Sequence, residues 1–215
     1  PAFDKFGGID VAAERKRLRE LFKIPESAFV ILHAGTGTPQ SWQADEITFK
    51  FVAQAIRDTN ILMRANDTNN TNNFSHRIVL IARAHPRDEK PNRYHELAPD
   101  LVMDKIPAFA GMTSLNLTDE LLPIADVAVA MYSTNLIHAC YLRIPAISIL
   151  LPDAGQKRLA AINLKDFPPN EVGASIGIYE PEITKLIKIL DRIKSNRKFQ
   201  AQIRAAQEKY FPFNK

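Results

Sequence analysis

The sequence is poor in cysteine and in long apolar runs. It has one cysteine, Cys140, among 215 residues, which excludes an internal disulfide. No apolar stretch approaches the roughly 20 residues of a membrane-spanning helix, and no basic-then-apolar segment at the start is typical of a signal peptide. We therefore expect a soluble, cytoplasmic chain in which Cys140 packs as an inert side chain of a helix.

Several cofactor signatures are also missing. In Gly35-Thr36-Gly37-Thr38-Pro39-Gln40, a dinucleotide fingerprint would need a third glycine at Gln40, and the Gly-Lys-Ser/Thr ending of a P-loop is absent. The histidines and carboxylates show no recognisable zinc spacing, and Asp126 indicates the start of a strand rather than a metal ligand. The sequence therefore predicts no metal ion and no resident cofactor.

The positive charge does not by itself identify a partner. The formal net charge is +4 and the isoelectric point is near 9.2, but Lys and Arg are concentrated in segments 14–20 and 185–209, where acidic residues are interspersed. Because no helix-turn-helix or aromatic-rich basic strand motif occurs, we expect no nucleic-acid partner.

The last helical segment allows two interpretations. Ile203, Tyr210, Phe211 and Phe213 stand near basic residues, a composition that suits either a helix docked on the core or attachment to an anionic membrane surface. Docking is the favoured interpretation, and peripheral association with the inner face of the membrane stays as the alternative.

Apolar runs predict the strands, and 3.6-residue periodicity predicts the helices between them. The predicted strands lie at 28–32, 77–84, 126–131 and 145–151, with weaker candidates at 101–103 and 174–178, and the predicted helices lie at 11–22, 42–57, 134–142, 182–193 and 197–210. Strand and helix alternate and nothing is typical of an interdomain linker. We predict one α/β domain over 1–215, with a Rossmann-like parallel sheet of about six strands and helices on both faces.

Three short polar motifs each follow a predicted strand. They are the glycine loop at 35–37, His85-Pro86-Arg87-Asp88, and Tyr132-Ser133-Thr134-Asn135. In a parallel sheet the carboxyl ends of the strands open onto one crevice, so the motifs are expected to converge there. Glycine amides, a histidine donor with a guanidinium, and hydroxyls at a helix N-terminus all suit phosphate oxygens. Together they predict a nucleotide-type site.

Each motif also has a plain structural interpretation. The glycine loop can be a tight turn, Arg87 can pair with the carboxylates that follow it, and Ser133 with Thr134 can cap a helix. A nucleophilic Ser133 is disfavoured because the glycine-flanked elbow of a hydrolase is missing.

Taken in order, these motifs resemble the C-terminal, donor-binding half of GT-B glycosyltransferases. Similar layouts occur in UDP-GlcNAc 2-epimerases, lipid A disaccharide synthase, HP-motif bacterial sialyltransferases and CDP-glycerol glycerophosphotransferases. The resemblance begins at Pro1-Ala2-Phe3-Asp4, similar to the end of an interdomain segment, and includes His85-Pro86. It is most specific at 125–134, followed by 143–147, and it covers nearly the whole chain.

The resemblance implies that the chain binds a nucleotide-activated sugar of UDP, CMP or CDP type. It implies a catalytic role for His85 at the leaving phosphate, without a metal ion. His138 stands where many GT-B families have a glutamate that holds the donor ribose. The donor-binding residues implied in this way are Gly35, Thr36, Gly37, His85, Arg87, Tyr132, Ser133, Thr134, Asn135 and His138.

The resemblance also implies a missing N-terminal domain that binds the acceptor, and the sequence starts at Pro1 without methionine. We therefore expect the C-terminal half of a longer two-domain enzyme, inactive in isolation, that serves cell-envelope polysaccharide synthesis. Two alternatives stay open: a UDP-GlcNAc 2-epimerase-like enzyme, and a non-catalytic nucleotide-binding or interaction domain.

Overall fold

The computed structural model describes residues 8–36, 39–66, 78–85, 87–90, 92–102 and 118–212. Residues 1–4, Gly37, Pro86 and Phe213, on which expectations were placed above, lie outside these ranges. The main elements are α1 (Val11–Leu21), β1 (Phe29–Ala34), α2 (Trp42–Asn66), β2 (Ile78–Arg83), α3 (Arg93–Leu97), β3 (Val127–Ala130), α4 (Thr134–Tyr141), β4 (Ala146–Ile149), α5 (Lys157–Ala161), α6 (Pro168–Glu171), β5 (Ile176–Ile178), α7 (Ile183–Ser195) and α8 (Arg197–Tyr210). Two 3₁₀ helices, η2 (Pro39–Ser41) and η4 (Thr118–Ile124), and one π-helix, η5 (Pro152–Gln156), are also described.

The strands form one parallel sheet of five strands in the order β2-β1-β3-β4-β5. Of the predicted strand at 101–103, Met103 lies outside the described residues, and Val102 forms a parallel bridge with Leu80 at the outer side of β2. The predicted α/β class and parallel sheet are thus confirmed; about six strands were predicted, and the described residues form five strands and one bridge.

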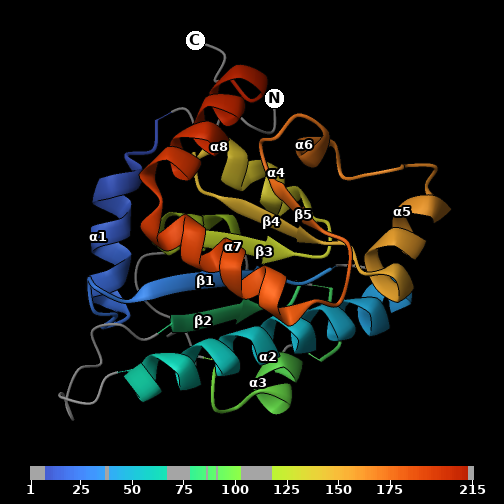
Figure 1. Cartoon of the computed structure of the whole chain (residues 1–215), viewed down its shortest axis with the longest axis horizontal. Helices are drawn as coiled ribbons and strands as arrows, with labels where there is room; N and C mark the ends of the chain where they lie inside the picture. Colours follow the sequence, from blue (N-terminus) through green and yellow to red (C-terminus); the bar gives the residue numbers. More distant parts are fainter. Residues whose placement is uncertain are drawn as a thin grey trace.

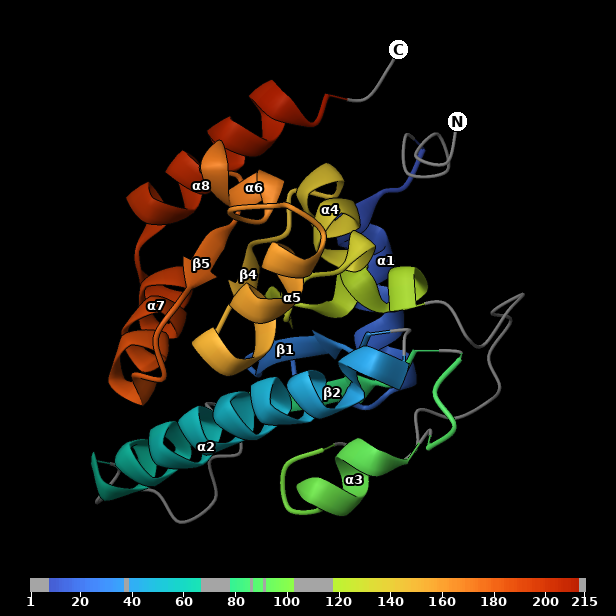
Figure 2. The same ribbon diagram turned by 90° about the vertical axis from the view of Figure 1, so that its right-hand side faces the viewer.

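Both faces of the sheet are covered, because successive strand residues point to opposite sides. In β1, Val30 and Leu32 enter the core beneath α1, η4 and α4. Phe29 and Ile31 enter the core beneath α2 and α7. Figure 1 shows α7 in front of the strands, and Figure 2 shows α2 and α7 on one side of them with α1 and α4 on the other. Buried apolar side chains on both sides explain why the strands read as continuous apolar runs.

The C-terminal helix α8 is docked on the rest of the protein. Ile203 is buried, and the ring of Phe211 packs edge-on against Tyr141 with ring centroids 5.5 Å apart. The Gln207 amide nitrogen donates to the carbonyl oxygens of Ile144 and Ala174. Docking, the favoured interpretation of this segment, is confirmed for these side chains. None of the described helices is both long and apolar enough to cross a bilayer.

Cys140 lies inside α4, fully buried as expected. Its thiol donates to the Ala174 carbonyl oxygen at 3.4 Å. Burial raises the pKa of this thiol to about 12, so at neutral pH it stays protonated and unreactive in the folded protein.

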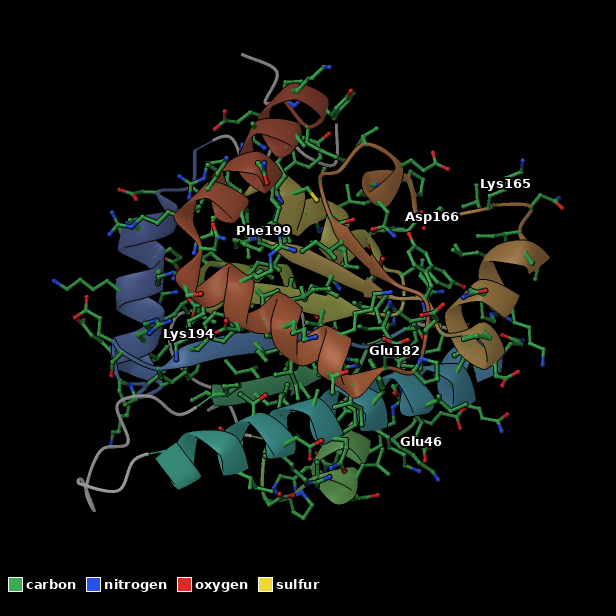
Figure 3. The ribbon with its side chains drawn as sticks, viewed as in Figure 1. Glu46, Lys165, Asp166, Glu182, Lys194 and Phe199 are labelled. Carbon is green, nitrogen blue, oxygen red and sulfur yellow. The ribbon has the colours of Figure 1, made fainter. Side chains whose placement is uncertain are left out.

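The carboxyl ends of the central strands are level with one another. Ala34 pairs with Arg83 across β1 and β2, and His33 pairs with Val129 across β1 and β3. Helix α7 runs against the strands: Figure 3 shows Glu182, its N-cap residue, at the carboxyl edge of the sheet and Lys194 near the amino edge. Figure 2 faces the carboxyl edge, with α5, the start of α2 and α3 around it.

Candidate functional site

The site is built at the point where the chain changes direction across the sheet. After β1 the chain continues to β2 on one side, and β3 lies on the other side of β1. In open parallel sheets, ligands bind outside the carboxyl ends of the strands at such a switch point. Gly35, His85 and Tyr132 come one or two residues after the ends of β1, β2 and β3, so the three polar motifs gather at this edge.

Gly35, the first residue of the glycine loop, lies directly against Arg83 and Tyr94. The Gly35 amide donates to the Arg83 carbonyl oxygen at 2.8 Å. A Cβ at this position would overlap the Tyr94 hydroxyl and would lie 3.1 Å from the Arg83 carbonyl oxygen. Thr36 is buried, and its hydroxyl has no hydrogen-bond partner among the described residues. Close approach of the backbone therefore requires glycine at position 35.

His85 sits in a tight turn that orients its ring. The Asp88 amide donates to the His85 carbonyl oxygen at 2.8 Å, and the Arg87 amide donates to His85 Nδ1 at 3.1 Å. The neutral imidazole must then carry its proton on Nε2. Burial, and next the charge of Arg87, lower the pKa of His85. At neutral pH the ring is an uncharged donor through Nε2, which suits a phosphate oxygen.

Arg87 and Asp88 do not pair with each other. The Arg87 side chain is exposed, and within the described ranges it makes no ion pair or hydrogen bond. Asp88 Oδ2 instead lies 2.8 Å from Arg93 Nε. Asp88 is thus paired with Arg93 rather than with Arg87, and within the described ranges Arg87 forms no ion pair with Asp88 or with Glu89.

Ser133 caps α4, as its structural interpretation predicts. Its backbone is extended, with φ −160° and ψ 147°, and its hydroxyl accepts from the Asn135 amide at 3.2 Å. Capping is compatible with anion binding, because a helix N-terminus has four unpaired amides and one side chain satisfies only one. Thr134 is exposed, and Tyr132, Asn135 and His138 are partly buried along this helix start.

A buried polar cluster lies beside these motifs, and sequence reasoning missed it. Its members are His33, Asp45, Asp88, Arg93 and Tyr94, which we call the Arg93 cluster. Asp45, in the first turn of α2, accepts from the Arg93 guanidinium and from the Tyr94 hydroxyl. Burial, and next the Asp45 charge, raise the pKa of Tyr94, so its hydroxyl stays a donor at any working pH.

Solved structures provide the comparison, since no protein-family model and no curated protein sequence matches the chain. The C-terminal domain of a group 1 glycosyl transferase (LpcC) from Francisella tularensis is matched over 96% of this chain and 100% of its own, with TM-score 0.52 and 14% identity. The wall teichoic acid polymerase TagF is matched over 94% of this chain and 42% of its own, with TM-score 0.55 and 14% identity. WaaG, a glycosyltransferase of lipopolysaccharide biosynthesis, gives TM-score 0.53 at 16% identity, over 92% of this chain and 46% of its own.

The chain has the fold of a GT-B C-terminal domain. The fold resemblance expected from the motifs is therefore confirmed. This GT-B half spans less than half the length of TagF and WaaG.

A further hollow lies at the carboxyl edge of the sheet, near the ends of β4 and β5. This hollow of about 840 Å³ is lined by Leu150, Gln156 and Tyr179, among others. The Tyr179 hydroxyl donates to Asp166 Oδ2 at 2.6 Å, which fixes the segment between α5 and α6 that carries Lys165 and Asp166 in Figure 3. A ligand larger than a phosphate group therefore has space along this edge.

Asp126 lies at the opposite edge of the sheet, where the strands begin. Its carboxylate lies 2.7 Å from Arg15 Nη1 and 2.9 Å from Arg19 Nη2, and it accepts from the Val30 amide at 2.7 Å. These contacts support the interpretation of Asp126 as a structural residue at the start of β3. Within the part of the chain that the structure describes, no three His, Cys, Asp or Glu side chains are grouped to hold a metal ion.

Proposed function

We propose that the chain is the donor-binding domain of a glycosyltransferase that transfers a sugar or a polyol phosphate from a nucleotide-activated donor to an acceptor hydroxyl. One observation carries the proposal: Gly35, His85 and the Ser133-capped start of α4 follow the carboxyl ends of β1, β2 and β3, at the edge of the sheet where the switch point between β1 and β3 lies. The fold alone does not define an activity, so the proposal depends on this site.

The mechanism follows from the groups present. As the bond to the transferred group breaks, negative charge develops on the nucleotide phosphate. His85 Nε2–H, the Arg87 guanidinium and the first amides of α4 are donors that would stabilise this charge. Because these groups supply positive potential themselves, the proposal includes catalysis without a metal ion.

The donor is proposed to be a UDP-, CDP- or CMP-activated compound. The structural neighbour HepE from Anabaena was solved in complex with UDP and glucose, at TM-score 0.50 and 14% identity. TagF was solved after soaking with CDPG. Both ligands support the proposal of a nucleotide-type donor.

Acceptor binding is proposed to belong to a further domain facing the carboxyl edge, because the chain matches less than half of TagF and WaaG. A cytoplasmic location at the inner face of the membrane and a role in cell-envelope polysaccharide synthesis remain predictions that follow from this function.

A thermal-shift and calorimetric titration tests the proposal. UDP, CDP, CMP, GDP and ADP are each added to the protein with EDTA and, separately, with Mg²⁺. A ligand that binds only the folded state stabilises it by about 2.7 kcal/mol at 100 times its Kd. We expect one nucleotide to raise the melting temperature in EDTA. No shift with any nucleotide would favour a non-catalytic module, and conversion of a UDP-sugar without an acceptor would favour the epimerase.

Replacing His85 tests the phosphate site directly. Loss of a hydrogen bond to a charged group costs about 1.5–3 kcal/mol, so His85→Ala should weaken nucleotide binding by roughly 10- to 100-fold. His85→Gln, which keeps an N–H donor, should lose less. Equal affinity of the wild type and His85→Ala would remove His85 from the site.

A further inference from the structure

The Arg93 cluster connects two of the three polar motifs. Arg93 binds Asp45 on α2 through Nη2, and its Nε lies 2.8 Å from Asp88 in the turn of His85. All three side chains are nearly inaccessible to solvent, with exposed fractions of 8%, 0% and 1%. A single guanidinium therefore bridges two carboxylates from elements that are far apart in sequence.

Each carboxylate is tied to a loop of the candidate site. Asp45 lies in the first turn of α2, the helix that follows the glycine loop. Asp88 closes the His85 turn through its amide, and its Oδ1 accepts from the Lys90 amide at 2.9 Å. Tyr94, which donates to Asp45, fills the space beside Gly35. The cluster thus touches the backbone of one loop and holds the turn of the other.

The cluster is not arranged for maximal hydrogen bonding. His33 Nε2 lies 3.6 Å from Asp45 Oδ1, beyond hydrogen-bond distance, and among the described residues neither His33 nitrogen has a hydrogen-bond partner. Buried polar groups are nearly always paired, and an apolar core often stabilises a fold better than buried charges do. A buried charged cluster with unpaired atoms beside a candidate site is more consistent with positioning than with stability.

We propose that Arg93 is a positioning residue that fixes the glycine loop and the His85 turn relative to each other, so that both reach the same diphosphate of the donor. The inference rests on the proposed donor site. Arginine suits this role because its guanidinium carries separate nitrogens, so that Nη2 hydrogen-bonds Asp45 while Nε lies at ion-pair distance from Asp88, an arrangement that the single nitrogen of a lysine ammonium cannot reproduce. Arg93 itself is buried and acts through Asp45 and Asp88.

The test compares Arg93→Lys with Arg19→Lys in the full chain. Arg19 is the matched control: its side chain is also 8% exposed and pairs with a carboxylate, but at the opposite edge of the sheet. With the nucleotide found in the titration above, we expect Arg93→Lys to bind about tenfold more weakly and Arg19→Lys to stay within about twofold. All titrations are made well below the melting temperature of each variant. If Arg93→Lys does not fold, Asp88→Asn, which keeps the Oδ1 acceptor, replaces it.

A double-mutant cycle separates positioning from general destabilisation. If Arg93 acts through His85, then adding Arg93→Lys to His85→Ala should weaken binding much less than it does in the wild type. Additive losses would overturn the proposed action through His85.

Hydrogen exchange of the ligand-free protein tests the positioning role of Arg93 without any nucleotide. We expect Arg93→Lys, but not Arg19→Lys, to accelerate exchange of both the Gly35 and the Asp88 amides. If the wild type binds no nucleotide, the proposed function fails while exchange still shows whether Arg93 holds both loops. Unchanged exchange at either amide overturns the inference, even if nucleotide binding is confirmed.

Discussion

Two buried arginines, one at each edge of the same sheet, use their donors differently. At the amino edge, Arg19 donates to the carbonyl oxygens of Pro25, Glu26 and Ala28 at 2.7–3.1 Å and to Asp126 at 2.9 Å. At the carboxyl edge, Arg93 binds carboxylates that belong to α2 and to the turn after β2.

Arg19 Nε and Arg93 Nε both lack a hydrogen-bond partner among the described residues, so the two edges differ instead in how completely their carboxylate oxygens are paired. The Asp126 oxygens accept from Arg15, Arg19 and the Val30 amide. In the Arg93 cluster, the His33 nitrogens and Asp45 Oδ1 have no hydrogen-bond partner within the described ranges. At the amino edge, the Arg19–Asp126 pair therefore connects the segments that precede β1 and β3. At the carboxyl edge, the pairs of Arg93 with Asp45 and Asp88 hold the loops around the candidate site.

The largest effect is expected from Asp126→Ala. Asp126 is partly buried and its partner Arg19 is buried, so removing the carboxylate leaves an uncompensated charge on Arg19, and the free energy of unfolding should fall by about 3 kcal/mol. Nucleotide affinity, measured where the variant is folded, should not change. Urea unfolding with Asp100→Ala as control checks this, since the exposed Arg57–Asp100 pair, 2.7 Å apart, should contribute less than about 1 kcal/mol. Equal losses in the two variants would contradict the structural role of Asp126.

Gly35→Ala should damage both stability and binding. The new Cβ would overlap the Tyr94 hydroxyl, and such overpacking costs about 1–3 kcal/mol. Gly8→Ala is the matched control, because no heavy atom lies within 4 Å of a Cβ built there. Thermal unfolding and nucleotide titration of both variants should show losses of stability and affinity for Gly35→Ala only. A Gly35→Ala protein as stable as the wild type would mean that Tyr94 moves away without cost.

Ser133→Ala separates capping from ligand binding. Loss of an N-cap costs about 1 kcal/mol, and the same loss is expected for Asn196→Ala, which removes the acceptor of the Phe199 amide at the start of α8. Only Ser133→Ala should also weaken nucleotide binding in calorimetry. If both variants bind nucleotide as the wild type does, Ser133 is a cap alone.

The smallest effect is a pH dependence of nucleotide affinity. Burial lowers the pKa of His85 in the free protein, and a bound phosphate raises it again. Affinity should therefore increase as the pH falls through the range where His85 protonates, by about threefold for a shift of half a pKa unit. The nucleotide affinity of His85→Gln should lack the increase caused by protonation of His85, and its remaining pH dependence should come only from the titration of the phosphate. Identical profiles of the two proteins would contradict contact between His85 and the phosphate.

The lowered pKa of His85 also makes the stability of the ligand-free protein depend on pH. Because folding lowers the pKa of His85, the unfolded chain takes up its proton first as the pH falls. The His85 contribution to stability is therefore present above the unfolded pKa and decreases as the pH falls below it.

The sequence predicted the strands and the longer helices, because their patterns are local, but not the short helices α3, α5 and α6. Apolar runs located all five strands, and caps such as Ser133 located the start of α4. The end of α2 was predicted at Arg57, but the helix continues to Asn66. Residues 58–60, Asp-Thr-Asn, are weak helix formers, and the Thr59 hydroxyl bonds back to the Ala55 carbonyl oxygen within the helix.

The Arg93 cluster could not be predicted in the same way, because Asp45 and Arg93 are 48 residues apart and no local pattern links them. One signal was available. Asp45 lies on the helical stripe of Phe49, Val52 and Ile56, which are all buried. An acidic residue in an apolar stripe implies a buried partner, but the identity of that partner requires the fold.

The buried thiol of Cys140 makes the protein its own reporter of unfolding. A thiol reagent can modify this single cysteine only when α4 separates from the sheet, so the labelling rate measures how often the core opens. Asp126→Ala should accelerate labelling, whereas Arg93→Lys should disturb the loops with a smaller change in rate. One unmodified side chain can thus distinguish loosened loops from an opened core without any engineered probe.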